Sequence, residues 1–166
     1  MIIKGKVHRY ADNINTDEII PARYLNTTDP KILGSHCLED LDKNFARKVR
    51  KGDILVVGKN FGCGSSREHA VVAIKAAGVS AIVAESYARI FFRNAINTGL
   101  PVFAAKEISG IKNGDAITIN TATGEIKNLS DGKIYRAEPM PEFLREIIKA
   151  GGLIAYVRRK KKISKD

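Results

Sequence analysis

Three short apolar segments, separated by stretches of helical length, constrain the fold of this chain most. Residues 54–58, 81–86 and 100–105 are rich in β-branched and small apolar residues and are bounded by turn residues. We interpret residues 67–77 and 88–97, each followed within two residues by a glycine, as the helices between them. Strand, helix, strand, helix, strand is the pattern of a parallel α/β sheet with flanking helices.

The remaining segments predict a less regular frame around this core. Residues 1–10 alternate between apolar and polar and predict a strand, whereas residues 11–30 are rich in Asn, Asp, Thr and Pro and predict a long loop. A loop of that length is uncommon in a compact domain unless it has a function. Residues 35–49 predict short helical pieces. The stretch after residue 111 predicts antiparallel hairpins, and residues 141–150 predict a final helix.

Composition indicates one globular domain. The chain has 166 residues, of which 44% are hydrophobic and 28% charged. We predict a domain over residues 1–157 and a basic tail over residues 158–166. No apolar run approaches the roughly 18 residues that a membrane span needs, and the N-terminus lacks the pattern of a signal peptide. We therefore expect a cytoplasmic protein without a membrane partner.

Cysteine and histidine are too few for a metal centre. Two cysteines, Cys37 and Cys63, and three histidines show none of the usual metal-ligand spacings. An iron–sulfur cluster commonly takes three or four cysteines. We expect no metal and no cofactor bound by this chain itself.

The positive charge is concentrated at the C-terminus. Six of the last nine residues are Lys or Arg, and they supply about half of the net charge of +10. Such a run is usually a solvated chain end. A docking or nucleic-acid patch is the alternative, although we do not expect a nucleic-acid partner.

The stretch GCGSSREHA, residues 62–70, has the features of an anion site. It follows a predicted buried strand and begins a helix, where backbone N–H groups and the helix dipole attract negative charge. Gly62 and Gly64 permit positive φ and close approach of a ligand to the backbone. Ser66 is a candidate N-cap, and Arg67 can bind a carboxylate through two hydrogen bonds.

Other interpretations of this loop remain open or fail on spacing. A glycine-rich turn with a serine cap is also common as plain structure. The spacing fits neither a P-loop nor a dinucleotide fingerprint, and the nucleophile elbow of hydrolases is missing. Cys63 is a candidate nucleophile, but a packing thiol fits it better, and His69 fits a helix-packing role. Arg89 and Arg93 fit a helix face, where they extend to solvent or pair with Glu85.

The block GKNFGCGSSREHA, followed by ARIFFRNAINTGLPVF, resembles the C-terminal swivelling domain of the aconitase family. With NTDEIIPARYL upstream, the chain is most similar to the stand-alone small subunits of 3-isopropylmalate dehydratases in that family. The likeness extends over roughly residues 1–155. It implies an aconitase-type swivelling β/β/α domain of the α/β class, with a parallel or mixed central sheet and flanking helices.

The resemblance also implies roles for individual residues. In the family the first serine of the block acts as the base, which here is Ser65. The second serine and the arginine bind the substrate carboxylate, and these are Ser66 and Arg67, with Gly64 beside them. The aspartate that orders the active site corresponds to Asp17.

The reaction implied is hydroxyl migration by dehydration and rehydration, from 2-isopropylmalate to 3-isopropylmalate in leucine biosynthesis. In the family the cysteines of a large subunit hold a [4Fe-4S] cluster. This chain lacks those cysteines, which agrees with the count above, so we expect it to be inactive alone. The expected partner is a cluster-bearing large subunit, in a heterodimer or heterotetramer.

The segment Tyr24, Leu25, Asn26 and Thr27 bears on the substrate. Homoaconitases resemble YLRT here, with an arginine for a third carboxylate, where this chain has Asn26. A buried, unpaired arginine would be costly beside an apolar isopropyl group, so Asn26 favours isopropylmalate. Arg23 could still reach a tricarboxylate. The alternatives are thus the small subunit of a homoaconitase or of a diacid hydro-lyase of broad specificity, and, from another class, a non-catalytic anion- or RNA-binding module.

Overall fold

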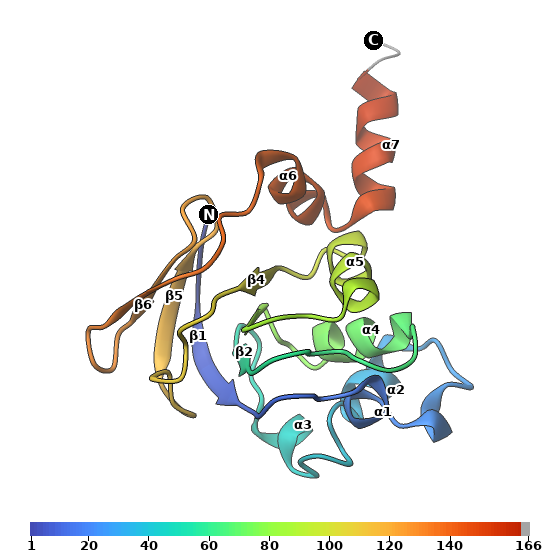
Figure 1. Ribbon diagram of the computed structural model, residues 1–166. Coiled ribbons are helices and arrows are strands. Elements are labelled where there is room, and N and C mark those ends of the chain that lie inside the picture. Colours follow the sequence, from blue (N-terminus) through green and yellow to red (C-terminus); the bar gives the residue numbers. More distant parts are fainter. Residues whose placement is uncertain (164–166) are drawn as a thin grey trace.

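One seven-stranded sheet, centred on its first strand, organises the molecule (Figure 1). The computed structural model describes residues 1–163. Along the sheet the strands lie in the order β4-β3-β2-β1-β5-β6-β7. Strand β1 (Ile2–Arg9) pairs in parallel with β2 (Ile54–Val57) through its last three residues and antiparallel with β5 (Ala116–Asn120) through its first five. The two halves of the sheet therefore share one strand.

The parallel half confirms the predicted alternation. Strand β2 is followed by α4 (Glu68–Ala76), β3 (Ala81–Ala84), α5 (Arg89–Asn97) and β4 (Val102–Ala104). Every residue of β2 and β3 is buried, because other parts of the chain cover both faces of these strands. Apolar runs without alternation are typical of such strands, and for this reason the sequence pattern predicted both strands correctly.

The antiparallel half confirms the predicted hairpins. Strand β5 pairs with β6 (Glu125–Asn128), which in turn pairs with the short edge strand β7 (Ile134–Arg136). Residues of β5 and β6 alternate between buried and more exposed positions, as expected where one face of a sheet is covered and the other meets solvent. The sheet is therefore mixed, as the family resemblance implied.

The segment predicted as a long loop is partly helical, so that prediction was wrong in its middle. It contains α1 (Thr16–Ile19) and a 3-10 turn, η1 (Ala22–Tyr24). A capping box begins α1, in which the Asn15 side chain accepts from the Glu18 N–H and the Glu18 carboxylate accepts from the Asn15 N–H. The predicted helical pieces that follow correspond in part to α2 (Pro30–Ser35) and α3 (Phe45–Lys48).

Two helices, not one, end the described chain. The predicted last helix is confirmed as α6 (Glu142–Ala150), which ends at Gly151 with a φ of 90°. The expectation that no helix follows is wrong, because the glycine pair only redirects the chain into α7 (Leu153–Ile163). Residues 158–163 of the expected tail are therefore helical, and the domain boundary predicted at residue 157 lies inside α7. Residues 164–166 of that tail lie outside the described residues.

The hydrophobic core is continuous across both sheet halves and the helices around α4. Helices α1, α2 and α5 all contact α4, and α6 contacts α5. The largest fully buried side chains include those of Phe45, Phe61, Phe103, Leu55 and Ile74. Within residues 1–163, no helix is both long and apolar enough to cross a membrane.

Tyr87 links β3 to β4 and packs against the aromatic rings of Phe61 and Phe91. Its hydroxyl lies 2.9 Å from the carbonyl oxygens of Ile82 and Phe103 and accepts the N–H of Phe103 at 3.2 Å. We expect Tyr87→Phe to lower the free energy of unfolding by about 1–3 kcal/mol, because buried backbone groups lose a partner. Urea denaturation measures this. Tyr156→Phe, which removes a hydroxyl near the exposed Glu146 carboxylate, is the control and should change little. Equal stabilities of both variants would contradict this role of Tyr87.

Candidate active site

The loop between β2 and α4 is held against the segment that leads into α1. The Gly62 N–H donates to the carbonyl of Ile14 at 2.8 Å, and the Thr16 N–H donates to the carbonyl of Cys63 at 2.9 Å. Asn15 and Cys63 form an isolated parallel bridge between these two hydrogen bonds. The two motifs that the sequence analysis singled out, about fifty residues apart, are therefore neighbours in space.

The glycines of this loop are required by its conformation. Gly62 has a φ of 79°, and a Cβ atom added to it would lie 2.2 Å from the ring of Phe91. Gly64 has a φ of 95°, and a Cβ atom added to it would meet no clash, with Thr16 Oγ1 the nearest atom at 3.5 Å. Gly62 thus lets the loop pack closely on α5. Gly64 leaves the backbone accessible to a ligand, as the anion-site interpretation expects.

Ser65 and Ser66 are both exposed to solvent. Within residues 1–163, neither the Ser65 nor the Ser66 hydroxyl has a hydrogen-bond partner. The Ser65 carbonyl accepts the Arg67 N–H at 2.9 Å. The expectation that Ser66 caps the helix is wrong, because Arg67 is the N-cap residue and no side chain caps α4. The first N–H groups of this nine-residue helix are therefore available to an anion.

Arg67 is tied to α1 through one nitrogen of its guanidinium group. Its Nη1 forms an ion pair with Asp17 Oδ1 and lies 3.5 Å from the carbonyl oxygen of Ile20. The Arg67 side chain is 16% exposed, and that of Asp17 is 63% exposed. Because these contacts use Nη1 alone, the Nη2 and Nε donors remain for a carboxylate. The structure thus places Asp17 where it orients Arg67.

Two residues next to this pair were not singled out by the sequence analysis. Thr16 is 2% exposed, and its hydroxyl at the base of the loop has no partner within the described residues. Asn15 begins α1 and so sets the position of Asp17. The spacing of Asn15 and Glu18 was a recognisable capping signal. For Thr16 the sequence carries no comparable signal.

The segment of residues 24–27 follows α1 closely, through the turn η1. The Tyr24 ring stacks on His36 at a centroid distance of 3.9 Å, while Asn26 is exposed and Leu25 packs partly on the core. The Thr27 hydroxyl accepts the Asp29 N–H at 3.1 Å, which closes a tight turn. Tyr24 is therefore anchored by stacking, and Asn26 is free to meet a substrate or a partner.

Arg23 is held by acidic residues and also lies against this segment, with its guanidinium carbon 4.8 Å from the centroid of the Tyr24 ring. Its guanidinium contacts both carboxylate oxygens of Asp40, at 2.7 and 3.1 Å, and lies 3.5 Å from Glu39. The Arg23 guanidinium also lowers the pKa of Asp40, chiefly through this hydrogen bond. A swing of Arg23 towards a tricarboxylate would have to break these contacts.

The end of this segment meets the first turn of α4. A cavity of about 220 Å³ is lined by Thr28, Leu33, Glu68, His69 and Val72. The Nε2 atom of His69 is buried and has no partner within the described residues. Thr28, the residue after the segment of residues 24–27, therefore lies at the same end of α4 as Arg67.

The other candidates of the sequence analysis are not part of a cluster. Cys37 is buried in the core and Cys63 is partly buried in the loop. Burial raises the pKa of the Cys37 thiol. Arg89 and Arg93 are exposed on α5, and neither pairs with Glu85 in the structure. Among residues 1–163, no three His, Cys, Asp or Glu side chains lie together as metal ligands.

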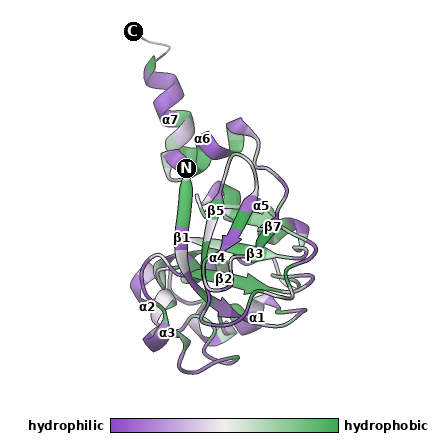
Figure 2. Cartoon of the chain, turned by 90° about the vertical axis from the view of Figure 1, so that its left-hand side faces the viewer, coloured by the Kyte–Doolittle hydropathy of each residue, from purple (hydrophilic) through white to green (hydrophobic). Residues whose placement is uncertain are grey.

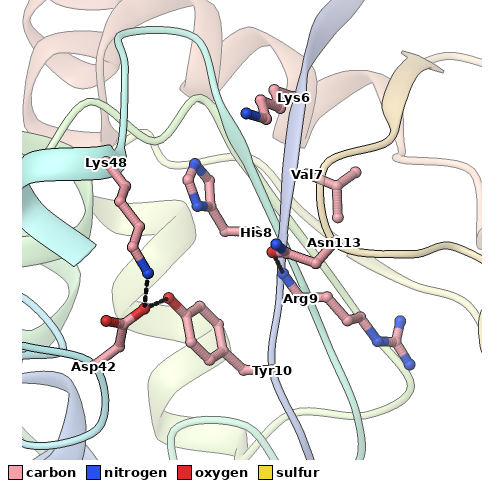
Figure 3. A pocket seen from close by; sticks show the side chains of 8 residues that line it. All are labelled: Lys6, Val7, His8, Arg9, Tyr10, Asp42, Lys48 and Asn113. Carbon is pink, nitrogen blue, oxygen red and sulfur yellow. Dashed lines mark hydrogen bonds and ion pairs between the residues drawn. The ribbon is translucent and has the colours of Figure 1, made fainter. Parts of the chain in front are cut away.

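A second cavity, of about 370 Å³, lies beside β1 and α3 (Figure 3). Within it Tyr10 donates to Asp42 at 2.9 Å, and Lys48 contacts the same carboxylate oxygen at 3.3 Å. His8 Nε2 lies 2.7 Å from Asp53 Oδ2. The main polar side chains around this cavity are thus already paired with one another next to β1. No residue of the loop between β2 and α4 lines the cavity.

Known proteins resemble this chain over nearly its whole length. Residues 3–107 match the family model of the aconitase C-terminal domain. The 3-isopropylmalate dehydratase small subunit of Caldicellulosiruptor bescii is 63% identical over 159 residues, which are 95% of this chain and 96% of that protein. The small subunit of the same name from Moorella thermoacetica is 61% identical over 165 residues, 99% of each chain.

A solved structure agrees with these relatives. The crystal structure of a 3-isopropylmalate dehydratase from Methanocaldococcus jannaschii superposes with a TM-score of 0.95 at 48% identity and covers 99% of this chain and 98% of its own. The swivelling-domain fold expected from the motifs is thereby confirmed. The chain belongs to the aconitase C-terminal domain family and, within it, to the family of 3-isopropylmalate dehydratase small subunits.

Proposed function

We propose that this chain is the small subunit of a 3-isopropylmalate dehydratase, which converts 2-isopropylmalate to 3-isopropylmalate by dehydration and rehydration in leucine biosynthesis. The observation that carries the proposal is the arrangement around Arg67. Its guanidinium is fixed by Asp17, next to two uncommitted serines and an uncapped helix start. The 63% identity to a small subunit of that name supports the same conclusion.

Arg67 and the start of α4 form the carboxylate clamp in this proposal. The Nη2 and Nε donors of Arg67 bind one carboxylate of the substrate, while the Ser66 hydroxyl and the first N–H groups of α4 supply further hydrogen bonds. Asp17 keeps the guanidinium in place when no substrate is bound. Because Arg67 is mostly buried, its side chain loses little conformational freedom on binding.

Ser65 is the proposed base, and its Oγ receives the proton in dehydration and returns it in rehydration. A serine exposed to water is far too weak a base for this step. Its pKa must fall strongly, and fixed donors such as backbone N–H groups and Arg67 lower it only when water is excluded. Ser65 is exposed here, so closure by a second chain has to complete its environment.

The large subunit is the proposed second chain, in a heterodimer or heterotetramer. The two cysteines of this chain lie on separate elements, and the described residues do not provide a cluster site. A [4Fe-4S] cluster held by the large subunit would supply the Lewis acid for the leaving hydroxyl. This chain supplies the clamp and the base, and its predicted location is the cytoplasm.

Asn26 is the proposed determinant of substrate choice. It is exposed on the turn after Tyr24, two residues before Thr28, which lines the cavity at the first turn of α4. An amide at this position gives no charge to a third carboxylate, and Arg23 is already paired with Asp40. Both features favour a dicarboxylate with an apolar branch over a tricarboxylate. A homoaconitase or a broad diacid hydro-lyase remains the alternative within the same reaction class.

Removal of the proposed base should stop the reaction without disturbing assembly. We expect Ser65→Ala, reconstituted with the large subunit, to lose about 10²- to 10⁴-fold in kcat, the range typical of general acid–base groups. Ser66→Ala is the matched control, and its main effect should be on KM. Size-exclusion chromatography should show an unchanged complex for both. Near-normal turnover of Ser65→Ala would exclude it as the base.

Shortening the clamp should weaken substrate binding. We expect Arg67→Lys to raise KM for 2-isopropylmalate about 10- to 100-fold, because a lysine can replace neither the two-point carboxylate contact nor the simultaneous contact with Asp17. Steady-state kinetics measures this. Arg93→Lys, on the exposed face of α5, should behave as the wild type. An unchanged KM in Arg67→Lys would contradict the clamp.

A charge at the specificity position should change substrate preference. We expect Asn26→Arg to shift the ratio of kcat/KM for homoaconitate over isopropylmalate by about tenfold or more, since the new guanidinium pairs with a third carboxylate. Assays of both substrates on one preparation give the ratio. Ala122→Arg, on the turn between β5 and β6, controls for added charge. If the two variants give the same ratio, this turn does not determine specificity.

A further inference from the structure

Helix α7 exposes both apolar and cationic side chains. None of its residues is buried, and Ile154 and Val157 are 70% and 41% exposed. Its second half contains five consecutive cations and no acidic residue: Arg158, Arg159, Lys160, Lys161 and Lys162. The helix begins beside α6 and α5 and then extends away from the body in both views (Figures 1 and 2). Most of its surface is therefore available to another molecule.

A groove connects α7 with the candidate active site along the outer side of α4. A volume of about 580 Å³ is lined by residues of α4, by Pro30, by the end of α5 and by Ile154, Ala155 and Arg158. Glu68 and Val72 line both this groove and the smaller cavity beside His69. Glu68 directly follows Arg67. A partner that covers the serine loop can thus continue along α4 to α7 without leaving the surface.

The charge of the surface indicates the chemistry of its occupant. Helix α7 contributes about half of the net charge of +10, and the rest of the chain is also positive. A second copy of this chain would bring like charges together, which disfavours self-association through this helix. An acidic surface with an apolar side chain for the groove is complementary to it. An exposed eleven-residue helix also has little stability of its own in water, so a surface that packs on it would stabilise it.

We propose that α7 and the groove along α4 form a docking surface for an acidic, partly apolar segment of the large subunit. Ile154 and Val72 provide the apolar contact, and Arg158 and Lys162, one turn apart on α7, face the acidic side chains. The surface sets the affinity and the approach of the two chains and takes no part in the chemistry. This inference rests on the proposed function, since it concerns the same partner.

The test measures binding and turnover separately, with the full-length chain and the cluster-loaded large subunit of the same organism. We expect Arg158→Glu/Lys162→Glu to raise the Kd of the complex about tenfold or more, mainly through slower association, and the difference from wild type to shrink at high salt. The kcat at saturating large subunit should not change. Lys127→Glu/Lys133→Glu, on exposed residues of the hairpin β6–β7, makes the same change in charge and should leave the Kd unaltered. Ile154→Ser should raise the Kd without altering its salt dependence, and circular dichroism checks that α7 remains helical.

The other outcomes would overturn the docking surface, the proposed function or both. Equal Kd values for the α7 and hairpin variants would overturn the docking surface, even if turnover confirms the proposed function. A weakened complex that never converts isopropylmalate would refute the proposed function and leave the docking surface standing. If wild type self-associates through α7, or binds RNA through it, while the affinity for the large subunit is unchanged in the variant, the occupant is not the one proposed. Absence of any complex would refute both.

Discussion

The backbone pairing of residues 62–63 with residues 14–16 is the constraint on which the candidate site depends. Two hydrogen bonds, from Gly62 to Ile14 and from Thr16 to Cys63, hold a loop of the parallel sheet against the start of α1. The pairing brings Asp17 to Arg67, and Arg67 adopts an extended conformation to reach α1, so that α4 begins only at Glu68. The uncapped helix, the exposed serines and the fixed guanidinium all lie next to this contact.

The site built in this way is complete on one side only. The proposed clamp is prepared in advance, because the ion pair with Asp17 holds Arg67 in the absence of a ligand, and such preorganisation lowers the cost of binding. The two hydroxyl groups remain in water, where a serine cannot act as a base. Helix α4 contacts α1, α2 and α5, and its outer side leads from the serine loop to α7. The same helix thus positions the chemistry and the surface through which a second chain would reach it.

Local sequence signals predicted most of the fold but failed where contacts between distant residues determine the conformation. The runs at residues 54–58 and 81–86 were recognised as strands because a strand covered on both faces needs no polar positions. Ser66 fitted an N-cap by composition, yet the helix begins one residue later, after an extended Arg67 that pairs with the distant Asp17. Gly151 and Gly152 after α6 were interpreted as the end of the final helix. They instead form a turn into a helix whose cations suit its C-terminal end.

By itself the sequence determined the family and the α/β class and suggested the residues of the proposed clamp and base, because apolar spacing and the GSSRE block are local and specific. Only the tertiary structure decided which donors remain available. The pairing of Arg67 with Asp17, that of Arg23 with Asp40, and the exposure of both serines depend on side chains that are distant in sequence. The position of α7 was likewise decided by packing against α5 and α6. Contacts of this kind arise when the chain closes on itself, so no local pattern encodes them.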